Sequence, residues 1–326
     1  IGTLGFRKNK ILKKRNLTTL DSLTLNKDLN EMSRKNINNV IIEASSHGLK
    51  QKRLNFLKPK AGIFTNLSHD HLDYHNNMRD YLESKLLLFN DLLEKGETVI
   101  TDSDIKQFNS IKKIQERRKL KILAIGSKGN TFKILSHKIF ENYQLLKTKY
   151  KNKTYKLKIN LYGTIQIKNL LMAILAAKVC GLKIEKIFKK LNKIKNVEGR
   201  LHLIRTLPNK SKIFLDYAHT PEALEKAIIS LREHFNKQYG ANVVLFYTTS
   251  LYGSSKSTSQ YEQLNRFINY ITACTLIGFH HNISIGANHR QRLKTIHRLF
   301  YTLFCQFGGI RTSGLLTLTT SRGHPQ

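Results

Sequence analysis

The sequence has few cysteines and no long hydrophobic run, and each shortage excludes a class of protein. The three cysteines, Cys180, Cys274 and Cys305, are widely spaced and form no C-x-x-C pair, so we expect reduced thiols in a cytoplasmic protein. No run approaches the eighteen apolar residues of a membrane-spanning helix, so we expect no membrane span. The first residues lack the basic, apolar and small-residue order of a secretory signal, which argues against secretion.

Acidic residues are also scarce: 22 Asp and Glu stand against 56 Lys and Arg, for a net charge of +34. Such a charge alone suggests a nucleic-acid partner. Lysine is spread evenly through the predicted helices and loops, often beside Asn and Ile, as A/T-rich codons would supply, and no nucleic-acid motif is present. We therefore expect no nucleic-acid partner. A basic nucleic-acid-binding protein remains the alternative from another class, and the salt dependence of a mobility shift would identify it.

Two short apolar runs near the start of the chain each end in polar and charged residues. Val40–Ile42 precedes Glu43, and Ala61–Phe64 precedes a segment rich in Asn, Asp and His. An open α/β sheet builds its ligand crevice at the carboxyl ends of such strands. We expect the chemistry of the protein to lie at these two strand ends.

The residues from Met78 to Leu93 have the apolar spacing of a helix, and Lys85 falls on the apolar stripe, one turn from Tyr81 and from Phe89. Such a lysine often extends its amine to solvent. The alternative is that burial lowers its pKa and the neutral amine captures carbon dioxide as a carbamate. A carbamate is an anionic oxygen ligand that could hold Mg²⁺ together with Glu43 and His71.

The rest of the first 246 residues alternates strands and helices, which predicts an α/β fold with a mostly parallel sheet and helices on both faces. We expect a helix with apolar positions at Leu25, Leu29 and Met32 and with Asp21 or Ser22 as its N-cap, and antiparallel strands with one wet face in residues 132–161. Further elements are expected as strands at 98–101, 120–125, 213–215 and 243–246 and as helices at 105–117, 164–179 and 222–235.

Two ordered motifs carry a resemblance to a known family. Residues 43–53 read Glu-x-Ser-Ser-His-x-Leu-x-Gln-x-Arg, and residues 64–75 read Phe-Thr-Asn-Leu-Ser-x-Asp-His-Leu-Asp-Tyr-His, with Lys85 following. This order resembles the Mur ligases, and in particular the members that add the third amino acid of the peptidoglycan stem peptide. The resemblance implies an ATP-dependent amide ligase that works through an acyl phosphate, with ATP and Mg²⁺ as cofactors.

The resemblance also implies roles for individual residues. Glu43, His71 and carbamylated Lys85 would hold the magnesium ion. The residues expected on the UDP-N-acetylmuramoyl dipeptide are Thr18, Thr19, Ser45, Gln51 and Arg53. Those expected on the nucleotide are Asn169, Arg200, Asp216 and His219. The sequence departs from the family at Leu17, where Asn is usual, and at Ile165 and Gln166, which replace Phe and Asn.

The resemblance covers only part of the chain. We expect residues 1–195 to be the central ATPase domain without its phosphate loop, and residues 196–246 to be the start of a Rossmann-like C-terminal α/β domain. Residues 247–326 hold two Lys and six Arg, against thirty-eight and ten in residues 1–246. This change of usage suggests a frame-shifted or unrelated tail, possibly disordered, and a replacement domain is the alternative. We therefore expect an incomplete enzyme that cannot complete the reaction.

Three further expectations follow from the resemblance. The partners are the UDP-N-acetylmuramoyl dipeptide and a diamino acid, which is diaminopimelate or lysine, diaminopimelate being the commoner. We expect a monomer. Another ligase of the same superfamily, such as a folylpolyglutamate synthase, is the alternative within the class, but it should lack the pattern from Ser45 to Arg53.

Overall fold

In the computed structural model of this protein, the described residues are 1–3, 5–8, 11–13, 16–206, 212–218, 221–235, 243–247 and 315–318. The chain divides into two compact units. One comprises Ile1–Asn196 with Ile229–Phe235, and the other comprises Val197–Ile228 with Asn236–Gln326. The expected domains 1–195, 196–246 and 247–326 stay predictions.

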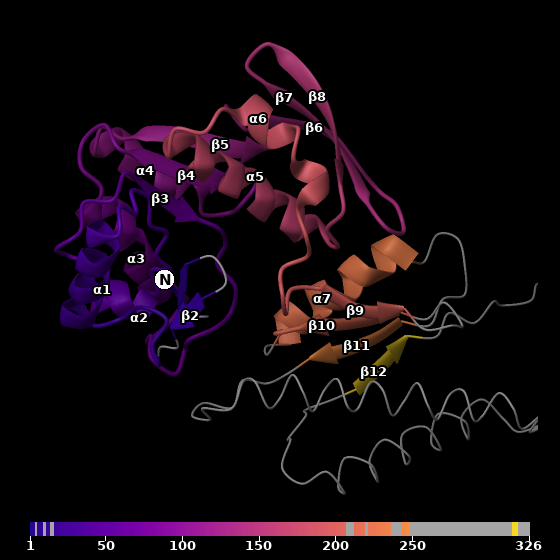
Figure 1. The fold of residues 1–326 in the computed structure, drawn as a ribbon, viewed down its shortest axis with the longest axis horizontal. Helices are drawn as coiled ribbons and strands as arrows, with labels where there is room; N and C mark the ends of the chain where they lie inside the picture. The colour runs from indigo at the N-terminus through magenta and orange to yellow at the C-terminus, as the bar shows by residue number, and fades with distance from the viewer. Residues whose placement is uncertain are drawn as a thin grey trace, which may run out of the picture. The chain divides into compact units, whose positions relative to one another are not determined.

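The first unit is built on a six-stranded sheet in the order β3-β4-β5-β6-β7-β8 (Figure 1). The first four strands run parallel and the last two are antiparallel. The parallel strands β3 and β4 span Ala61–Phe64 and Thr98–Asp102, and β5 spans Lys121–Gly126. This architecture confirms the predicted α/β class with a mainly parallel sheet.

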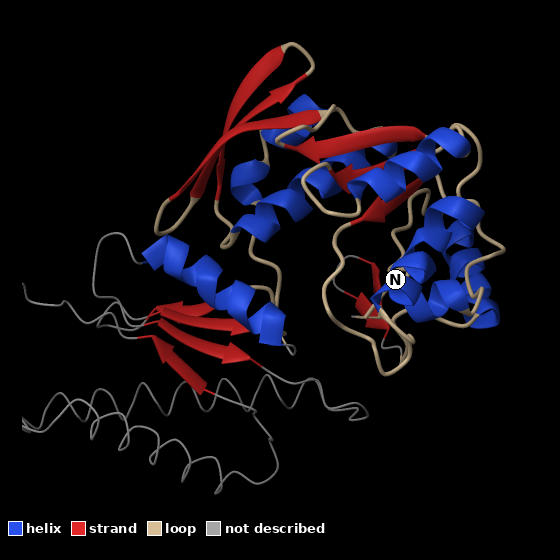
Figure 2. Cartoon of the chain, turned by 180° about the vertical axis from the view of Figure 1, so that it is seen from behind, coloured by secondary structure: helices blue, strands red, loops and turns tan. Residues whose placement is uncertain are grey.

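Helices cover both faces of the parallel strands (Figure 2). Successive residues of a strand point to opposite faces, and in β4 the side chain of Val99 packs in a cluster with α4 while that of Ile100 packs in a cluster with α5. The helix α4 spans Phe108–Arg117, three residues later than the expected start, and α5 spans Thr164–Val179 as predicted.

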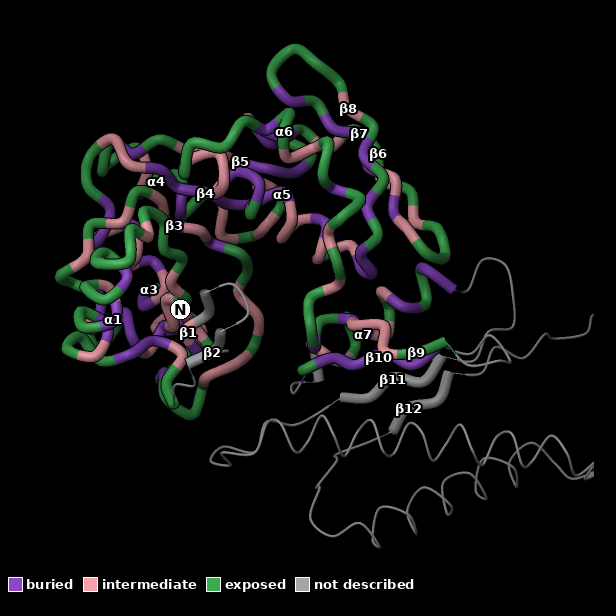
Figure 3. Tube along the Cα trace, in the orientation of Figure 1, coloured by how far each residue is buried: buried purple, intermediate pink, exposed green. Residues whose placement is uncertain are grey.

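The antiparallel strands alternate between buried and exposed side chains. They are β6 at Phe132–Ile139, β7 at Gln144–Tyr150 and β8 at Lys153–Ile159. Along β7 the residues Leu146, Thr148 and Tyr150 are buried, and the lysines between them are exposed (Figure 3). The expected wet face of lysines is confirmed. The helix α6 at Ile184–Phe188 and the 3-10 turn η2 at Leu191–Lys193 follow α5.

Short elements precede the sheet. The strands β1, Phe6–Lys8, and β2, Ile11–Lys13, pair antiparallel. The helix α1 spans Ser22–Arg34, and its N-cap is Asp21, whose carboxylate accepts a hydrogen bond from the backbone N–H of Thr24 at 2.9 Å. The five-residue α2 spans Ser46–Lys50.

The helix expected over residues 78–93 changes its winding near its end. α3 spans Met78–Leu87 and continues as a π-helical turn, η1, over Leu88–Leu92. The amide oxygen of Asn77 caps α3 by accepting from the N–H groups of Arg79 and Asp80. The π turn buries Phe89 completely against β3 and β4.

The strand expected at Val40–Ile42 is not formed, and that prediction was wrong. Its backbone hydrogen bonds go instead to Ile1, whose amino group donates to Ile41 O at 2.7 Å and whose carbonyl accepts from Glu43 N–H at 2.9 Å. Ile41 is 73% exposed. An apolar run becomes a strand only when a neighbouring strand pairs with it along its length, and the two hydrogen bonds to Ile1 do not form such a ladder. The first described strand begins at Phe6, after a single bridge between Gly2 and Gly5.

The second unit holds a four-stranded sheet in the order β12-β11-β10-β9. The central strands β10, Lys212–Asp216, and β11, Val243–Tyr247, run parallel, and the helix α7, Pro221–Phe235, connects them. The outer strands β9, His202–Thr206, and β12, Leu315–Leu318, pair antiparallel. Apart from β11 and β12, the expected tail lies outside the described residues.

Candidate functional site

The three expected magnesium ligands come from three separate segments of the first unit. Glu43 lies just before α2, His71 lies in the loop between β3 and α3, and Lys85 lies in the last turn of α3. Burial lowers the pKa of the Lys85 amine, and the carboxylates of Asp70 and Glu43 act in the opposite direction. Lys85 is therefore within electrostatic range of the segments that carry both other residues.

Lys85 is half-buried, and its amine lies over an aromatic ring. Its Nζ lies 5.0 Å from the ring centre of Tyr81, which is itself only 4% exposed. Burial, together with the charge of Asp70, raises the pKa of Tyr81 to about 12, so its phenol stays protonated. Only an unprotonated amine reacts with carbon dioxide, and burial increases the fraction of Lys85 in that form.

The carboxylate of Glu43 is fixed by the N-terminal segment. Its Oε2 accepts hydrogen bonds from the backbone N–H of Thr3 at 2.8 Å and from the Thr3 hydroxyl at 2.9 Å. Gly2 passes so close that a Cβ at this position would lie 2.6 Å from the same oxygen. Close approach of the backbone therefore holds the Glu43 side chain in one orientation, which is a requirement for a metal ligand.

His71 has a left-handed backbone conformation, with φ of 57°. This conformation costs about 1 kcal/mol for a residue with a Cβ and is found where surrounding contacts stabilise it. The His71 N–H donates to Asp70 Oδ1 at 2.8 Å, and its carbonyl accepts from the N–H of His75 at 2.9 Å. The ring of His71 packs edge-on against Tyr81, with centroids 5.5 Å apart.

The donor set fits a magnesium ion only if Lys85 is modified. Within the described ranges, no three side chains of His, Cys, Asp or Glu lie together so as to hold a metal. Glu43 and His71 supply two ligands of that kind, and a carbamate on Lys85 would supply oxygen as the third. Magnesium prefers oxygen ligands and keeps several waters, so a set of two oxygen donors and one imidazole is compatible with it. The metal role of these residues stays a prediction.

Four of the five residues expected on the muramyl dipeptide, all but Thr18, form one hydrogen-bonded group. The Thr19 hydroxyl donates to Glu43 O and accepts from the Ser45 N–H, each at 2.8 Å. The Ser45 hydroxyl accepts from the N–H of Gly48 at 3.1 Å and caps α2. The Thr18 hydroxyl oxygen lies 3.1 Å from the Thr3 hydroxyl oxygen, at hydrogen-bond distance. Thr19 is 1% exposed, so its hydroxyl supports this segment from inside.

Arg53 and Gln51 continue this group toward the loop that carries His71. Arg53 Nη1 donates to Thr19 O at 2.7 Å, and Nη2 donates to Gln51 Oε1. Gln51 Nε2 in turn donates to the hydroxyl of Tyr74 at 3.1 Å. The structure therefore links Thr19, Ser45, Gln51 and Arg53 to one another, while Thr18 bonds to Thr3. The contact of all five residues with substrate stays a prediction.

The residues expected on the nucleotide fall in both units. Asn169 is half-buried in α5 of the first unit, and Arg200 is exposed in the second. Asp216, at the end of β10, is buried and accepts hydrogen bonds from the N–H groups of Leu201 and Ala218, each at 2.8 Å. Burial raises the pKa of Asp216, and these two hydrogen bonds oppose that change. His219 lies outside the described residues.

Sequence reasoning missed a buried ion pair at the carboxyl end of the sheet. Asp102, the last residue of β4, is 2% exposed and lies 2.6 Å from Nζ of Lys168 on α5. The Lys168 amine also lies 3.5 Å from Asp104. The sequence did contain a signal for Asp102, which is an acidic residue directly after an apolar strand, the pattern that also singled out Glu43. It contained no signal for the partner of Asp102, because Lys168 lies 66 residues further along the chain.

Sequence reasoning also missed the roles of the aromatic rings that surround His71. His47, His75 and Tyr74 occur in the two family motifs, but no role was assigned to them. His75 is 1% exposed, and its Nε2 is hydrogen-bonded to the Ser46 hydroxyl at 2.9 Å. Burial is the main cause that lowers the pKa of both His47 and His75, so both imidazoles are neutral near pH 7.

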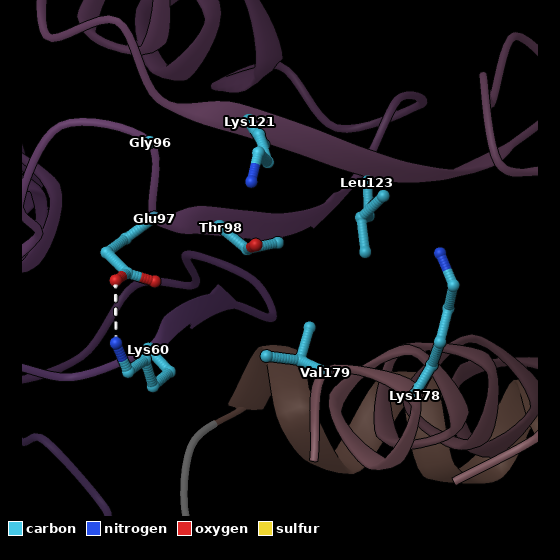
Figure 4. Close-up of a pocket in the computed structure, with 8 residues that line it drawn as sticks. All are labelled: Lys60, Gly96, Glu97, Thr98, Lys121, Leu123, Lys178 and Val179. Carbon is cyan, nitrogen blue, oxygen red and sulfur yellow. Dashed lines mark hydrogen bonds and ion pairs between the residues drawn. The ribbon is translucent and has the colours of Figure 1, made fainter. Parts of the chain in front are cut away.

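A hollow of about 320 Å³ lies elsewhere on the first unit (Figure 4). Its lining consists of Lys60, Gly96, Glu97, Thr98, Lys121, Leu123, Lys178 and Val179. Lys60 precedes β3, and Thr98 and Lys121 begin β4 and β5, so the hollow lies at the amino ends of the parallel strands. None of the expected site residues lines it. Ligands of open α/β sheets bind at the carboxyl ends, and the hollow is therefore not the expected crevice.

Comparison with known proteins gives a family and named relatives. The Mur ligase middle domain matches residues 1–177. UDP-N-acetylmuramoyl-L-alanyl-D-glutamate--2,6-diaminopimelate ligase of Rickettsia bellii is 38% identical over 216 residues, which are 66% of this chain and 44% of that protein. The Zymomonas mobilis enzyme of the same name is 35% identical over 234 residues, with coverages of 72% and 48%. The chain spans about half the length of these relatives.

A solved structure of a ligase with this name is also similar, with a TM-score of 0.63 and 28% identity over 74% of this chain and 50% of that one. No described helix is both long enough and apolar enough to cross a bilayer. The match over residues 1–177 covers more than half of the 326 residues. The chain therefore belongs to the Mur ligase family, as its two motifs predicted.

Proposed function

We propose that this chain provides the central part of an ATP-dependent ligase in the cytoplasm that joins 2,6-diaminopimelate to UDP-N-acetylmuramoyl-L-alanyl-D-glutamate. The names of its relatives support this substrate pair. The observation that carries the proposal is the half-buried amine of Lys85, with its lowered pKa, within electrostatic range of Glu43 on a helix that follows the loop of His71. A lysine that only extends its amine to solvent would not require partial burial close to Glu43.

The proposed modification of Lys85 is a simple addition. The lone pair of the neutral amine attacks the carbon of CO₂, an N–C bond forms, one C–O π bond breaks, and the nitrogen loses a proton to water. The product is an anionic carbamate. The lowered pKa of Lys85 increases the fraction of neutral amine that can react.

Glu43, His71 and carbamylated Lys85 would hold a magnesium ion. When bound, the ion would neutralise negative charge on phosphate oxygens. The Glu43 carboxylate is already fixed by Thr3, and Asp70 fixes the backbone of His71, so the segments that carry both ligands need little reorganisation when the ion enters.

The proposed reaction needs two anionic substrates to be held together. The terminal glutamate carboxylate of the dipeptide attacks the γ-phosphorus of ATP, and the acyl phosphate that forms is then attacked by the amine of the diamino acid, with loss of phosphate. Arg53, joined to Thr19 and Gln51, would orient the dipeptide near Glu43. Asn169, Arg200, Asp216 and His219 would bind ATP. The contribution of these residues is positioning, which can supply several kcal/mol of the barrier.

The test is carbon-13 NMR of the protein in ¹³C-labelled bicarbonate. We expect one slowly exchanging carbamate signal in the unsubstituted chain and its loss in Lys85→Met. Lys178→Met is the matched control, since Lys178 also lies on a helix and should leave the signal intact. A signal that persists in Lys85→Met, or that is absent in the unsubstituted chain at saturating bicarbonate, would overturn the proposal.

A further inference from the structure

The ring of His47 lies at the centre of an aromatic group formed with the loop that carries His71. Its centroid is 3.9 Å from that of Tyr74, with the planes tilted by 33°, and 5.2 Å from that of His71 in an edge-on arrangement. The ring of His75 lies 5.5 Å away on another side. Residues 71, 74 and 75 thus contact one imidazole that belongs to α2.

The loop at residues 70–75 needs such support because His71 has the left-handed backbone conformation, with φ of 57°. Local hydrogen bonds from His71 to Asp70, and from Tyr74 and His75 to the His71 carbonyl, define the turn. They fix the backbone but leave the His71 ring free to rotate about χ1 and χ2. Contacts of the ring itself restrict that rotation: it packs against Tyr81 and His47, and its Nε2 lies 3.9 Å from Oδ2 of Asp70.

The helix α2 is itself a rigid base for His47. Ser45 caps it, and Gly48 lies so close to Thr19 that an added Cβ would be 2.5 Å from Thr19 Cγ2. α2 also contacts the loop at two further points. The Ser46 hydroxyl is bonded to the buried His75 ring, and the Lys50 amine lies 5.7 Å from the Tyr74 ring centre.

From this geometry we propose that His47 is a positioning residue, whose ring holds the His71 imidazole in the orientation in which it joins Glu43 and Lys85. The inference rests on the proposed magnesium site. His47 acts through the flat shape of its ring, so an aromatic ring without nitrogen should replace it and a branched aliphatic side chain should not. Residues that orient a metal ligand typically change metal affinity by about 10-fold or more when they are removed.

The experiment compares His47→Leu with His47→Phe in the full chain after equilibration with bicarbonate. The first readout is the affinity for Mn²⁺, a paramagnetic substitute for Mg²⁺, measured by electron paramagnetic resonance. We expect about 10-fold weaker binding in His47→Leu and a change below about 3-fold in His47→Phe. His137→Leu is the control for loss of an imidazole, because His137 lies on β6 and bonds to Gln144.

The second readout is amide hydrogen exchange of residues 70–75 without metal. It should be faster in His47→Leu and unchanged in His47→Phe and His137→Leu. Wild-type exchange in His47→Leu, or equal damage by Leu and Phe, would overturn the inference. If Mn²⁺ binding requires His71 but is insensitive to His47→Leu, the inference alone fails. If the unsubstituted chain binds no Mn²⁺, the magnesium site and the role of His47 both fail.

Discussion

The side-chain amine of Lys168 lies 2.6 Å from Oδ2 of Asp102 and joins α5 to the carboxyl end of β4. Asp102 is 2% exposed at its side chain, and Lys168 is 29% exposed. The pair is therefore open to solvent on the lysine side only. It fixes the first turns of the helix that carries Asn169, and it does so at the edge of the sheet where ligands of α/β proteins bind.

Removing the lysine should cost more stability than removing the charge of its partner. Lys168→Met leaves the Asp102 carboxylate buried without a cation, and we expect a loss of about 2 kcal/mol, below the range of about 3 to 5 kcal/mol for fully buried pairs because Lys168 is partly exposed. Asp102→Asn keeps a polar side chain without a buried charge and should cost less. Urea unfolding of both variants measures the difference.

Lys178→Met is the matched control for the ion pair, since it removes a lysine from the last turn of the same helix. It should change the free energy of unfolding by less than about 0.5 kcal/mol. Equal losses in Lys168→Met and Lys178→Met would show that the Asp102 contact does not stabilise the fold.

Thr19→Val tests whether the Thr19 hydroxyl supports the segment that carries Glu43 and Ser45. The substitution keeps the shape but leaves the Ser45 N–H and the Glu43 carbonyl without this partner. A buried polar group that loses its partner costs about 1 to 3 kcal/mol, so we expect a loss in that range by chemical denaturation. Thr18→Val is the control because the Thr18 hydroxyl contact is exposed. A loss in Thr18→Val as large as that in Thr19→Val would contradict the argument.

Local patterns in the sequence predicted most of the elements that form. The alternation of apolar and lysine residues along β7 and the capping carboxylate of Asp21 at α1 are signals within a few residues of each other, and both appear as expected. Val40–Ile42 had the same apolar signal but formed no strand. Strand formation depends on a neighbouring strand to pair with, and the composition of a short segment does not show whether that strand is present.

In the candidate site, too, features set by one segment were predictable and contacts between distant segments were not. The partial burial of Lys85 was predictable, because its position on an apolar stripe is a property of one helix. The packing of His47 against Tyr74 and the pairing of Lys168 with Asp102 were not, because each joins segments whose separation is set by the tertiary fold. The family motifs included His47 and Tyr74 but gave no physical reason for their presence.

Gly62→Ala should destabilise the contact between β3 and the π turn. A Cβ at Gly62 would lie 2.9 Å from Cε1 of Phe89 and 3.1 Å from Cγ of Leu88. Both side chains belong to the packed core, so we expect a loss of about 1 to 3 kcal/mol from overpacking. Phe89→Leu opens space beside Gly62, and the double variant should lose less than the sum of the two single losses.

Gly96→Ala separates this steric effect from backbone strain. Gly96 has φ of 86° and nothing within 4 Å of an added Cβ, so only strain of about 1 kcal/mol is expected. Phe89→Leu should add to Gly96→Ala without any interaction energy. Additivity in both double variants, measured by urea unfolding, would disprove the overpacking at Gly62.

Asp104 should make stability depend on pH in the acidic range. Burial raises the pKa of this carboxyl, but the Ser127 hydroxyl and N–H, which donate to it at 2.7 to 3.0 Å, together with Lys168 outweigh that effect and hold the pKa below its usual value. The unfolded chain therefore binds the proton more readily. The stabilisation is full above the unfolded pKa of about 3.9 and is lost as the pH falls through the lower folded pKa.

The measurement is the free energy of unfolding of the unsubstituted chain and of Asp104→Asn between about pH 7 and pH 3, where other carboxyl groups contribute equally to both. We expect Asp104→Asn to be less stable at pH 7 and the difference to shrink toward pH 3. Ser127→Ala removes one donor, so it should lose about 1 kcal/mol near neutral pH and shift the decline to higher pH. A difference between the unsubstituted chain and Asp104→Asn that stays constant over this range would show that the Asp104 carboxylate does not stabilise the fold through its charge.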